Sequence, residues 1–221
     1  MNKKVETKDL FDRIPDYIRP LLEQSRYPWE ILPKIKAYIE NLVQAEPTRF
    51  TELAPGVYVG EKVTIHPSAV ILPPAVIGDE CEIRPNAYIR GSVITGARCV
   101  IGNSTELKNC VLLDGVQVPH YNYVGDSVLG NRAHMGAGAV CSNFKAAGNE
   151  VVVHGEREYP TGLTKLGGIL GDGADVGCGC VLNPGTVIGK NTAVYPLNAL
   201  RGVFPAECIV KSQENIVERR K

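Results

Sequence analysis

The sequence lacks the features that mark several large classes of protein. No apolar run approaches the roughly 18 residues that a membrane-spanning helix needs, and the N-terminal MNKK leads into charged residues without the apolar core of a signal peptide. The 24 basic and 24 acidic residues cancel, so no positive charge excess attracts nucleic acid or a membrane surface. We therefore expect a soluble cytoplasmic protein with no nucleic-acid or membrane partner.

Cysteine and histidine are few, and their spacing favours no common metal or disulfide motif. Seven cysteines is an odd number, and none forms a Cys-x-x-Cys pair, which argues against a disulfide framework and a zinc knuckle and fits a reducing cytoplasm. A catalytic zinc site would need three of the only four histidines, His66, His120, His134 and His154. Their spacing neither favours nor excludes this, and we expect no metal.

What the sequence does contain is a repeat of six residues. Every sixth residue from Val59 to Pro119 is aliphatic in nine of eleven positions, and the same holds without exception from Leu170 to Leu200. A period of six matches neither the helical period of 3.6 nor simple strand alternation. It predicts three short strands per triangular coil, with one bulky residue of each hexad pointing inward.

A second position, four residues after the bulky one, is restricted to small or β-branched residues. It includes Val63, Ala69, Ala75, Cys81, Ala87, Val93, Cys99, Thr105 and Val111, and also Cys180. We interpret Cys81, Cys99 and Cys180 as packing residues in a narrow interior. Ordinary parallel crossovers are right-handed, but similarity to the known hexapeptide-repeat proteins implies a left-handed parallel β-helix, an all-β fold.

Three parts are expected: a helical segment over 1–50, the β-helix over 51–205 and a C-terminal tail over 206–221. In the first, apolar spacing and Pro33 predict a helix over 34–44, and a second over 16–24 is disturbed by Pro20. This segment has no Gly-rich phosphate loop. We expect it to cover the open end of the coil or to contact another subunit, rather than to catalyse.

The hexad fails at two places. An insertion rich in glycine occupies about 142–169, with a short strand predicted at 151–154, and long ordered loops on rigid repeats tend to carry binding groups. A second break is expected at 119–124, where the phase slips by one residue beside His120. A histidine near its ordinary pKa can accept a proton from an amine or hydroxyl. We therefore expect the binding and catalytic residues to lie at these two breaks in the repeat.

Three motifs between Ile89 and Asn143 carry a resemblance to a known family. They are GNSTELK from Gly102, HYNYVGD from His120 and MGAG from Met135, and no gap is needed from Arg90 through Phe144. They resemble the acetyltransferase domain of the bacterial bifunctional enzyme that acetylates glucosamine-1-phosphate and then uridylylates it. The resemblance covers about two thirds of the chain. The nucleotidyltransferase domain has no counterpart in these residues, so uridylyl transfer is not expected.

The resemblance implies roles for individual residues. His120 falls on the catalytic base that deprotonates the sugar ammonium, and Arg90 and Lys108 fall on sugar-phosphate ligands, where a guanidinium and an ammonium together can clamp one phosphate. Further substrate-binding positions are Tyr123, His134, Asn143, Phe144 and, through a gap inside the insertion, Lys165. Acetyl-CoA would meet Ala137, whose N–H could stabilise the thioester oxyanion, and also Cys178, Arg201 and Lys211.

Three of these positions depart from the family pattern. His134 replaces an asparagine, Phe144 replaces a tyrosine and Cys178 replaces a serine, so the acceptor sugar could differ from glucosamine-1-phosphate. The sequence thus predicts an acetyl-CoA-dependent N-acetyltransferase acting on an amino-sugar phosphate or nucleotide sugar, as a homotrimer with sites between adjacent coils. The alternatives are a β-helix that binds such a sugar or assembles with partners without catalysis, and a metal-dependent lyase.

Overall fold

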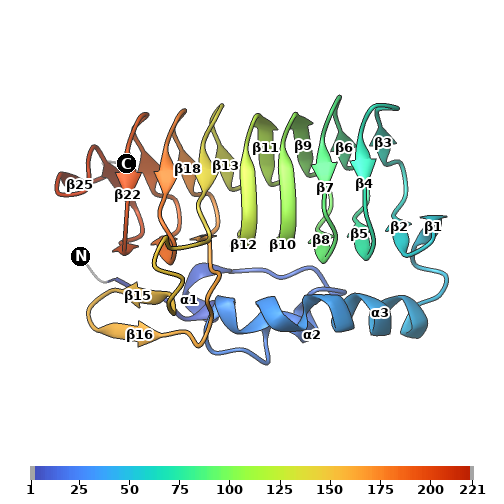
Figure 1. The fold of residues 1–221 in the computed structure, drawn as a ribbon, viewed down its shortest axis with the longest axis horizontal. Helices are drawn as coiled ribbons and strands as arrows, with labels where there is room; N and C mark the ends of the chain where they lie inside the picture. Colours follow the sequence, from blue (N-terminus) through green and yellow to red (C-terminus); the bar gives the residue numbers. More distant parts are fainter. Residues whose placement is uncertain (1–2, 220–221) are drawn as a thin grey trace.

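The computed structural model describes residues 3–219, which form a parallel β-helix with a helical segment along one side (Figure 1). The coil has three faces, each a stack of short parallel strands. The first face holds β2 (Val57–Val59), β5 (Ala75–Ile77), β8 (Val93–Thr95), the second halves of β10 (Glu106–Leu112) and β12 (Tyr123–Leu129), β17 (Gly168–Leu170), β20 (Thr186–Ile188) and β23 (Val203–Phe204).

The other two faces complete each coil. The second face holds β4 (Val70–Ile71), β7 (Tyr88–Ile89), the first halves of β10 and β12, β14 (Val140–Cys141), β19 (Val181–Leu182) and β22 (Ala199–Leu200). The third face holds β3 (Thr64–Ile65), β6 (Glu82–Ile83), β9 (Val100–Asn103), β11 (Gln117–His120), β13 (His134–Met135), β18 (Asp175–Val176), β21 (Ala193–Val194) and β24 (Cys208–Val210). The predicted parallel β-helix of hexapeptide repeats is confirmed.

The interior contains one bulky and one small side chain per hexad, as the repeat predicts. Cys81, Cys99 and Cys180 lie buried at the small position, and all seven cysteines are free. The coil turns tightly at its edges, where residues such as Ser104 and Tyr121 have a positive φ. These edges explain why glycine and short polar residues recur there.

The register of the predicted core is wrong at one step. Leu112 and Cys110 point into the coil, whereas Leu113 and Val111 pack outside it, against the helical segment. The step from Leu107 to Leu112 is five residues, because β10 runs across an edge of the coil. A second five-residue step, from Val124 to Leu129, occurs in β12. The repeat is therefore regular at 119–124, where a break was expected. It is interrupted instead by the two five-residue steps before and after this stretch.

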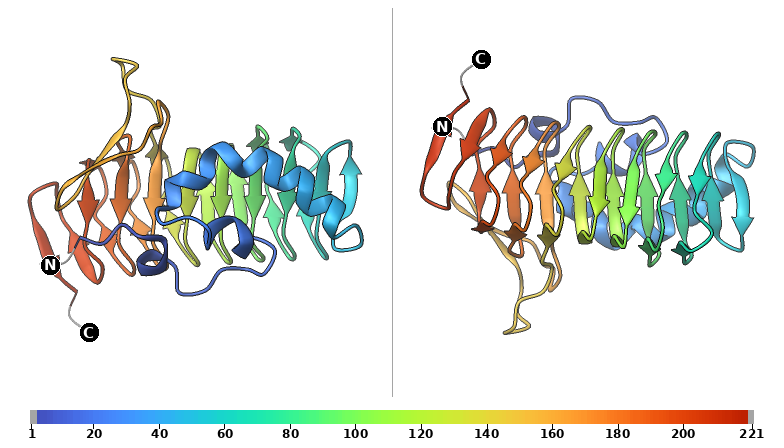
Figure 2. Two further views of the ribbon diagram at one scale, coloured as in Figure 1. Left: turned by 90° about the horizontal axis from the view of Figure 1, so that it is seen from below. Right: turned by 90° about the horizontal axis from the view of Figure 1, so that it is seen from above.

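The N-terminal segment covers the first face along its length, and not an open end of the coil (Figure 2). It comprises α1 (Thr7–Leu10), α2 (Arg19–Leu22), a 3₁₀ helix η1 (Pro28–Lys34) and α3 (Ile35–Ala45). Together with Val151, Val153 and Leu166 of the insertion, the segment packs on outward-pointing aliphatic residues of the first face: Val76, Ile94, Val111, Val128, Ile169, Val187 and Val203. An exposed apolar stripe of this length must be covered, which explains the lateral position. None of the helices within 3–219 is long and apolar enough to cross a membrane.

Antiparallel strands cover the two ends of the coil. At the start β1 (Thr51–Ala54) pairs with β2, and at the finish β25 (Ile216–Glu218) pairs back on β24. Because β24 adds a parallel strand beyond β21, the coil continues past residue 205, where we expected a tail to begin. These strands satisfy backbone groups that an open edge would expose.

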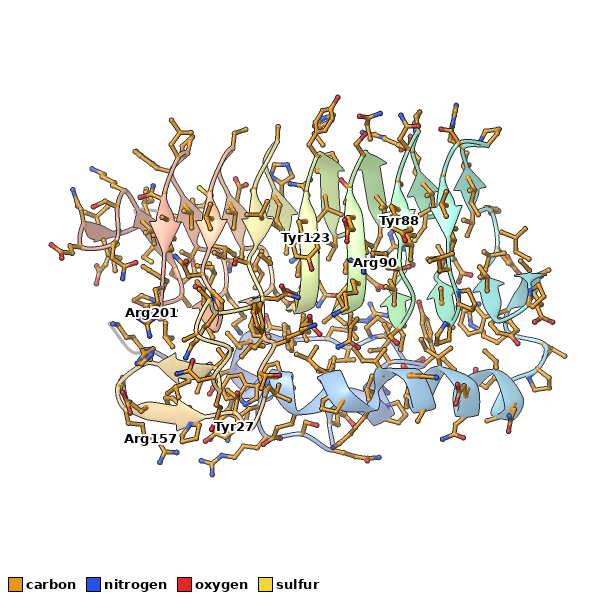
Figure 3. All side chains as sticks on the ribbon, in the orientation of Figure 1. Tyr27, Tyr88, Arg90, Tyr123, Arg157 and Arg201 are labelled. Carbon is orange, nitrogen blue, oxygen red and sulfur yellow. The ribbon has the colours of Figure 1, made fainter. Side chains whose placement is uncertain are left out.

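The insertion folds away from the coil as a hairpin of β15 (Val152–His154) and β16 (Glu158–Pro160). The hairpin packs on the N-terminal segment: the Tyr159 ring centroid lies 5.7 Å from that of Tyr27, and Arg157 Nη2 lies 3.2 Å from the Tyr27 hydroxyl (Figure 3). The far part of the insertion is therefore structural. Its two ends, near Asn143 and Lys165, border the second face, and so does His154 of β15, whose Nε2 lies 2.7 Å from Arg201 Nη2.

Candidate active site

The edge between the third and second faces carries three predicted site residues in consecutive coils. The Gly138 N–H donates to the His120 carbonyl (3.0 Å), and the Gly179 N–H donates to the Ala137 carbonyl (2.9 Å). These bonds place His120, Ala137 and Cys178 at equivalent positions, one per coil, about 4.8 Å apart. All three are exposed. We call this row the His120 edge.

Two backbone N–H groups of the His120 edge are free to bind a ligand. Within residues 3–219, the N–H groups of Ala137 and Cys178 donate no hydrogen bond. The preceding Gly136 allows the coils to approach, because a Cβ there would lie 2.6 Å from the Cys178 nitrogen. Unpaired N–H groups in a fixed backbone can stabilise a carbonyl oxygen that gains negative charge.

A buried asparagine, which the sequence analysis missed, holds this edge together. Asn122 Oδ1 accepts a hydrogen bond from the His120 N–H (3.1 Å), and Asn122 Nδ2 donates to the carbonyls of Gly136 (2.8 Å) and Ala139 (3.1 Å). One amide side chain thus joins the coil that carries His120 to the coil that carries Ala137. The signal in the sequence is a polar residue at the small inward position.

The two residues predicted to bind the phosphates of acetyl-CoA lie in different places. Lys211 follows β24, two coils beyond Cys178, and lies one residue before the position that is in register with the His120 edge. Arg201 follows β22, at the other side of the second face, and its Nη2 lies 2.7 Å from His154 Nε2. Of these two residues, Lys211 and not Arg201 lies beside the His120 edge.

The second face presents Tyr123 beside a glycine. A Cβ added to Gly125 would lie 2.4 Å from the Tyr123 hydroxyl and 2.8 Å from Asn143 Nδ2. The tyrosine side chain thus lies along the strand towards the start of the insertion. Burial raises the pKa of Tyr123, and the carboxylates of Glu106 and Asp126 raise it further. The hydroxyl is a protonated donor at neutral pH.

Arg90 lies two coils from this tyrosine, on the same face (Figure 3). Its Nη1 lies 2.6 Å from Glu106 Oε1, and its guanidinium carbon lies 5.9 Å from the Tyr88 ring centroid. The hydrogen bond to Glu106 raises the pKa of Arg90. The predicted phosphate ligand is thus paired with a carboxylate, and an incoming phosphate must compete with Glu106.

Lys108 is held in the same way by a buried carboxylate. Asp126 Oδ2 lies 3.2 Å from Lys108 Nζ, and Oδ1 accepts a hydrogen bond from Asn109 Nδ2 (2.8 Å). Asn143 Nδ2 also donates to Oδ2 of Asp126. We call these four residues the Asp126 cluster. Asp126 ends the HYNYVGD motif, to which the resemblance gave no role for this residue, and it joins Lys108 to the insertion.

The two ends of the insertion meet beside the Asp126 cluster. Phe144 pairs with Lys165 in an antiparallel bridge, and Lys165 Nζ lies 6.0 Å from the Phe144 ring centroid. The Gly167 N–H donates to the Asp126 carbonyl (2.8 Å). The sequence alignment reached Lys165 only through a gap, and the fold brings it next to Phe144.

His134 stands apart from the other substrate-binding positions. It lies on β13 in the third face, and its Nδ1 lies 2.8 Å from Asp175 Oδ1. Tyr123 and Lys108 lie on the second face of the same coil region. Within residues 3–219, no group of three or more His, Cys, Asp or Glu side chains is arranged to hold a metal ion.

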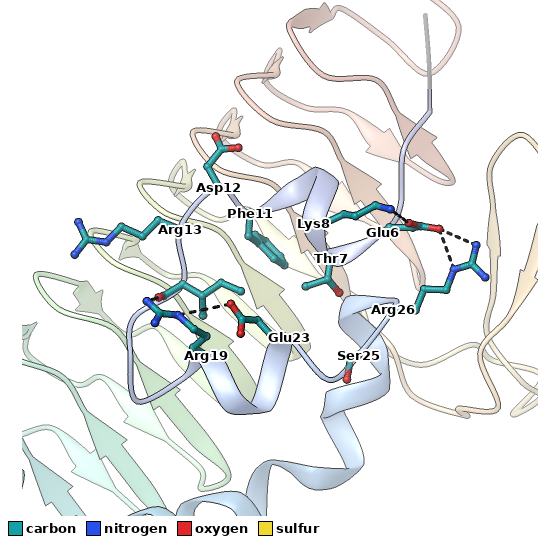
Figure 4. A pocket seen from close by; sticks show the side chains of 11 residues that line it. Glu6, Thr7, Lys8, Phe11, Asp12, Arg13, Arg19, Glu23, Ser25 and Arg26 are labelled. Atoms are coloured by element: carbon teal, nitrogen blue, oxygen red, sulfur yellow. Dashed lines mark hydrogen bonds and ion pairs between the residues drawn. The ribbon is translucent and has the colours of Figure 1, made fainter.

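Another cavity lies away from these residues, in the N-terminal segment (Figure 4). It measures about 950 Å³. Its charged groups pair with one another: Glu6 bonds Lys8 (3.0 Å) and Arg26 (2.7 Å), and Arg19 lies 3.7 Å from Glu23. None of the predicted site residues lines this cavity, and we assign it no role.

Two family descriptions match the chain. The GMPPB C-terminal domain matches residues 81–158, and the bacterial transferase hexapeptide (six repeats) matches residues 56–91. A solved structure of a mutant of AntD, an N-acyltransferase from Bacillus cereus in complex with dTDP-4-amino-4,6-dideoxyglucose and coenzyme A, overlaps 74% of this chain and 83% of that one. Its TM-score is 0.43 and its sequence identity is 22%.

Curated relatives match the chain over about half of its length. The bifunctional protein GlmU of Methanococcus aeolicus is 28% identical over 120 residues, which are 54% of this chain and 29% of that protein. The bifunctional sugar-1-phosphate nucleotidylyltransferase/acetyltransferase of Sulfurisphaera tokodaii is 34% identical over 96 residues, 43% of this chain and 24% of that protein. The chain thus spans less than a third of these relatives. It carries bacterial transferase hexapeptide repeats and is related to the bifunctional GlmU proteins, as its motifs predicted.

Proposed function

We propose that the protein transfers an acetyl group from acetyl-CoA to the amine of an amino-sugar phosphate or a nucleotide-linked amino sugar. The observation that carries this proposal is the His120 edge, where an exposed imidazole and two free backbone N–H groups lie in consecutive coils. The relationship to a protein named as a sugar-1-phosphate nucleotidylyltransferase/acetyltransferase supports the same reaction class.

In the proposed mechanism His120 acts as general base. It takes a proton from the sugar ammonium, the free amine attacks the thioester carbon, and the Ala137 N–H stabilises the oxyanion that forms. When the C–S bond breaks, the proton on His120 passes to the departing coenzyme A thiolate, and the nitrogen of the new amide gives up its second proton to water. Asn122 keeps His120 and Ala137 in register through its bonds to both coils.

The acceptor sugar would lie across the second face, between the His120 edge and the Asp126 cluster. Tyr123 lies between them along the strand and offers a hydroxyl donor. Arg90 and Lys108 would hold the phosphate, with Lys165 as a third cation from the insertion. Glu106 and Asp126 balance the first two charges, so the phosphate must displace or share these partners.

Acetyl-CoA would follow the His120 edge past Cys178 towards Lys211. In this order the thioester lies near Ala137 and the phosphates lie near the lysine, whose ammonium can bind them. His134 lies on the third face and would meet substrate only if an adjacent subunit completed the site. Lys211 replaces Arg201 in this assignment, because the latter lies off the edge.

We propose a homotrimer in the cytoplasm as the working form. On a single chain, exposed apolar side chains lie on the second face and along the His120 edge: Val70, Leu72, Tyr88, Tyr121, Tyr195 and Leu197. Apolar surface of this kind is suited to contact with a second coil. The seven free cysteines fit a reducing compartment. We assign uridylyl transfer to none of the described residues, since residues 3–50 form short helices packed on the coil.

The test follows release of the coenzyme A thiol from acetyl-CoA, with glucosamine-1-phosphate and nucleotide-linked amino sugars as acceptors. We expect turnover with at least one acceptor and a loss of at least about a hundredfold in His120→Ala. His66→Ala, which changes an exposed histidine elsewhere on the coil, should keep full activity. Full activity in His120→Ala would refute the mechanism. Sugar-phosphate binding with no turnover on any acceptor would favour the non-catalytic binding protein.

A further inference from the structure

A second cavity, of about 450 Å³, lies at the base of the insertion beside the candidate site. It begins where the Asp126 cluster ends, since Asn143 bonds Asp126 and the next residue, Phe144, lines the cavity. Across from it lie Asn183 and Arg201 of the second face. The volume is in the range of small-ligand sites, and acetyl transfer as described above leaves it unused.

The cavity is positioned by the stacking of the second face. Lys108 pairs with Gly125, and the residues that follow in register in the next coils are Ser142, Asn183 and Arg201. At about 4.8 Å per coil, the row from Lys108 to Arg201 is about 19 Å long. A ligand whose sugar lies near Tyr123 and whose phosphate meets Lys108 would extend along this row into the cavity.

The lining has the chemistry of a nucleotide site. Phe144 is 50% exposed, which is unusual for a phenylalanine, and it offers a ring face to a base. The charged residues that line the cavity are Lys145 and Arg201, with no acidic residue among the lining residues. The amide of Asn183 adds hydrogen-bonding groups for a ribose or a base edge.

Arg201 is the cation best prepared to bind a phosphate. Within residues 3–219 no carboxylate lies within 4 Å of its guanidinium, in contrast to Arg90 and its partner Glu106. Its Nη2 donates to His154 Nε2 at 2.7 Å, because a guanidinium has no acceptor atom. The histidine therefore orients Arg201 without neutralising its charge, and the remaining N–H groups of the guanidinium can bind phosphate oxygens.

We propose that this cavity binds a nucleoside diphosphate, supplied by the acceptor, so that the acceptor is a nucleotide-linked amino sugar and not a free sugar phosphate. This inference rests on the proposed function for the fate of the sugar amine. Acetyl-CoA also carries a nucleoside diphosphate, but its proposed path follows the His120 edge, on the opposite side of the second face. The acceptor is therefore the source that the geometry favours.

The first experiment measures binding without catalysis. Uridine, guanosine and thymidine diphosphates are titrated into the full chain by calorimetry, with inorganic pyrophosphate and coenzyme A in parallel. We expect at least one nucleoside diphosphate to bind, and its affinity to fall about tenfold in Phe144→Leu and in Arg201→Met. Arg132→Met, an exposed arginine remote from the cavity, is the control. Thermal melting checks that each variant is folded.

Three outcomes would overturn the inference. The first is that no nucleoside diphosphate binds. The second is that pyrophosphate binds equally well and Phe144→Leu has no effect. The third is that saturating coenzyme A abolishes nucleotide binding, which would show that the cavity binds the cofactor. Thiol release then separates the two proposals. Turnover of glucosamine-1-phosphate without nucleotide binding refutes the cavity's role alone, whereas nucleotide binding without turnover of any amino sugar refutes the acetyl transfer alone.

Discussion

The buried carboxylate of Asp126 binds the ammonium group of Lys108, with Oδ2 and Nζ 3.2 Å apart. The same carboxylate accepts hydrogen bonds from Asn109 and Asn143, and the carbonyl of Asp126 receives the Gly167 N–H. One residue thus joins a predicted phosphate ligand to both ends of the insertion. Arg90 and Lys108, the residues predicted to bind phosphate, are each paired with a carboxylate. Their orientation is therefore fixed before a substrate binds.

Asp126→Asn should weaken acceptor binding more than it slows the chemical step. The amide keeps the size of the side chain but removes its charge and turns one of its two acceptor oxygens into a donor, so Lys108, Asn109 and Asn143 can no longer all keep their bonds. We expect KM for the acceptor to rise about tenfold with a smaller change in kcat, and the free energy of unfolding to fall by roughly 1–3 kcal/mol. Steady-state kinetics and urea denaturation measure both. Asp175→Asn, on the exposed partner of His134, should change neither; an unaltered KM in Asp126→Asn would contradict the prediction.

Asn122→Ala should lower kcat through the position of His120. The substitution removes the side-chain partner of the His120 N–H and of the Ala139 carbonyl, and it leaves the Gly136 carbonyl with only the Ala139 N–H, which costs roughly 1–3 kcal/mol of stability. A matched control is Asn198→Ala: this residue occupies the equivalent position in a later coil, where its amide bonds the Tyr195 carbonyl (2.8 Å). Both variants should be destabilised in thermal melting, but only Asn122→Ala should lose catalysis. Equal kcat values in the two would show that Asn122 is merely structural.

Gly136→Ala should separate the coils at the His120 edge. Its Cβ would lie 2.6 Å from the Cys178 nitrogen, a backbone atom that cannot turn aside. Overpacking of this kind costs roughly 1–3 kcal/mol, and the displaced N–H groups should lower kcat. Gly138→Ala is the comparison, since its Cβ would meet nothing within 4 Å and only its φ of +69° is unfavourable. Acetyl transfer in Gly138→Ala should exceed that in Gly136→Ala, and the reverse order would contradict the geometry.

The attachment of the helical segment to the coil should weaken in acid. Arg49 donates to Asp79 twice (3.1 and 2.7 Å), which holds the pKa of Asp79 below its ordinary value of 3.8. The stabilisation from a lowered carboxyl pKa is complete above that ordinary value and is lost as the pH falls through the folded one. Asp79→Asn should therefore lower the melting temperature at pH 7, and the difference from wild type should shrink below pH 3.8. Asp16→Asn, an exposed control, should show no such pattern, and a constant difference for Asp79→Asn would rule out the ion pair as its cause.

The sequence alone predicted the parallel coil and its interior. The repeat acts locally, because every six-residue unit of strand and edge must place one bulky and one small side chain in the same narrow interior. The same rule explains why His120, Ala137 and Cys178 fall on one edge, since residues at equivalent phases stack even when the separation along the chain varies. The left-handed winding came from the resemblance and not from the count of six.

Only the tertiary structure shows where the six-residue repeat is interrupted, where the helical segment packs and which distant residues join the site. The five-residue steps at Lys108 and Asp126 let β10 and β12 cross an edge, and they exchange the inward and outward roles of Cys110 and Val111. The helical segment covers a side of the coil because the outward residues of the first face are apolar, a need that appears only when the strands are stacked. Asp126 and Lys165 join the site for the same reason: their partners lie far away in sequence, so long-range packing, and not local pattern, brings them together.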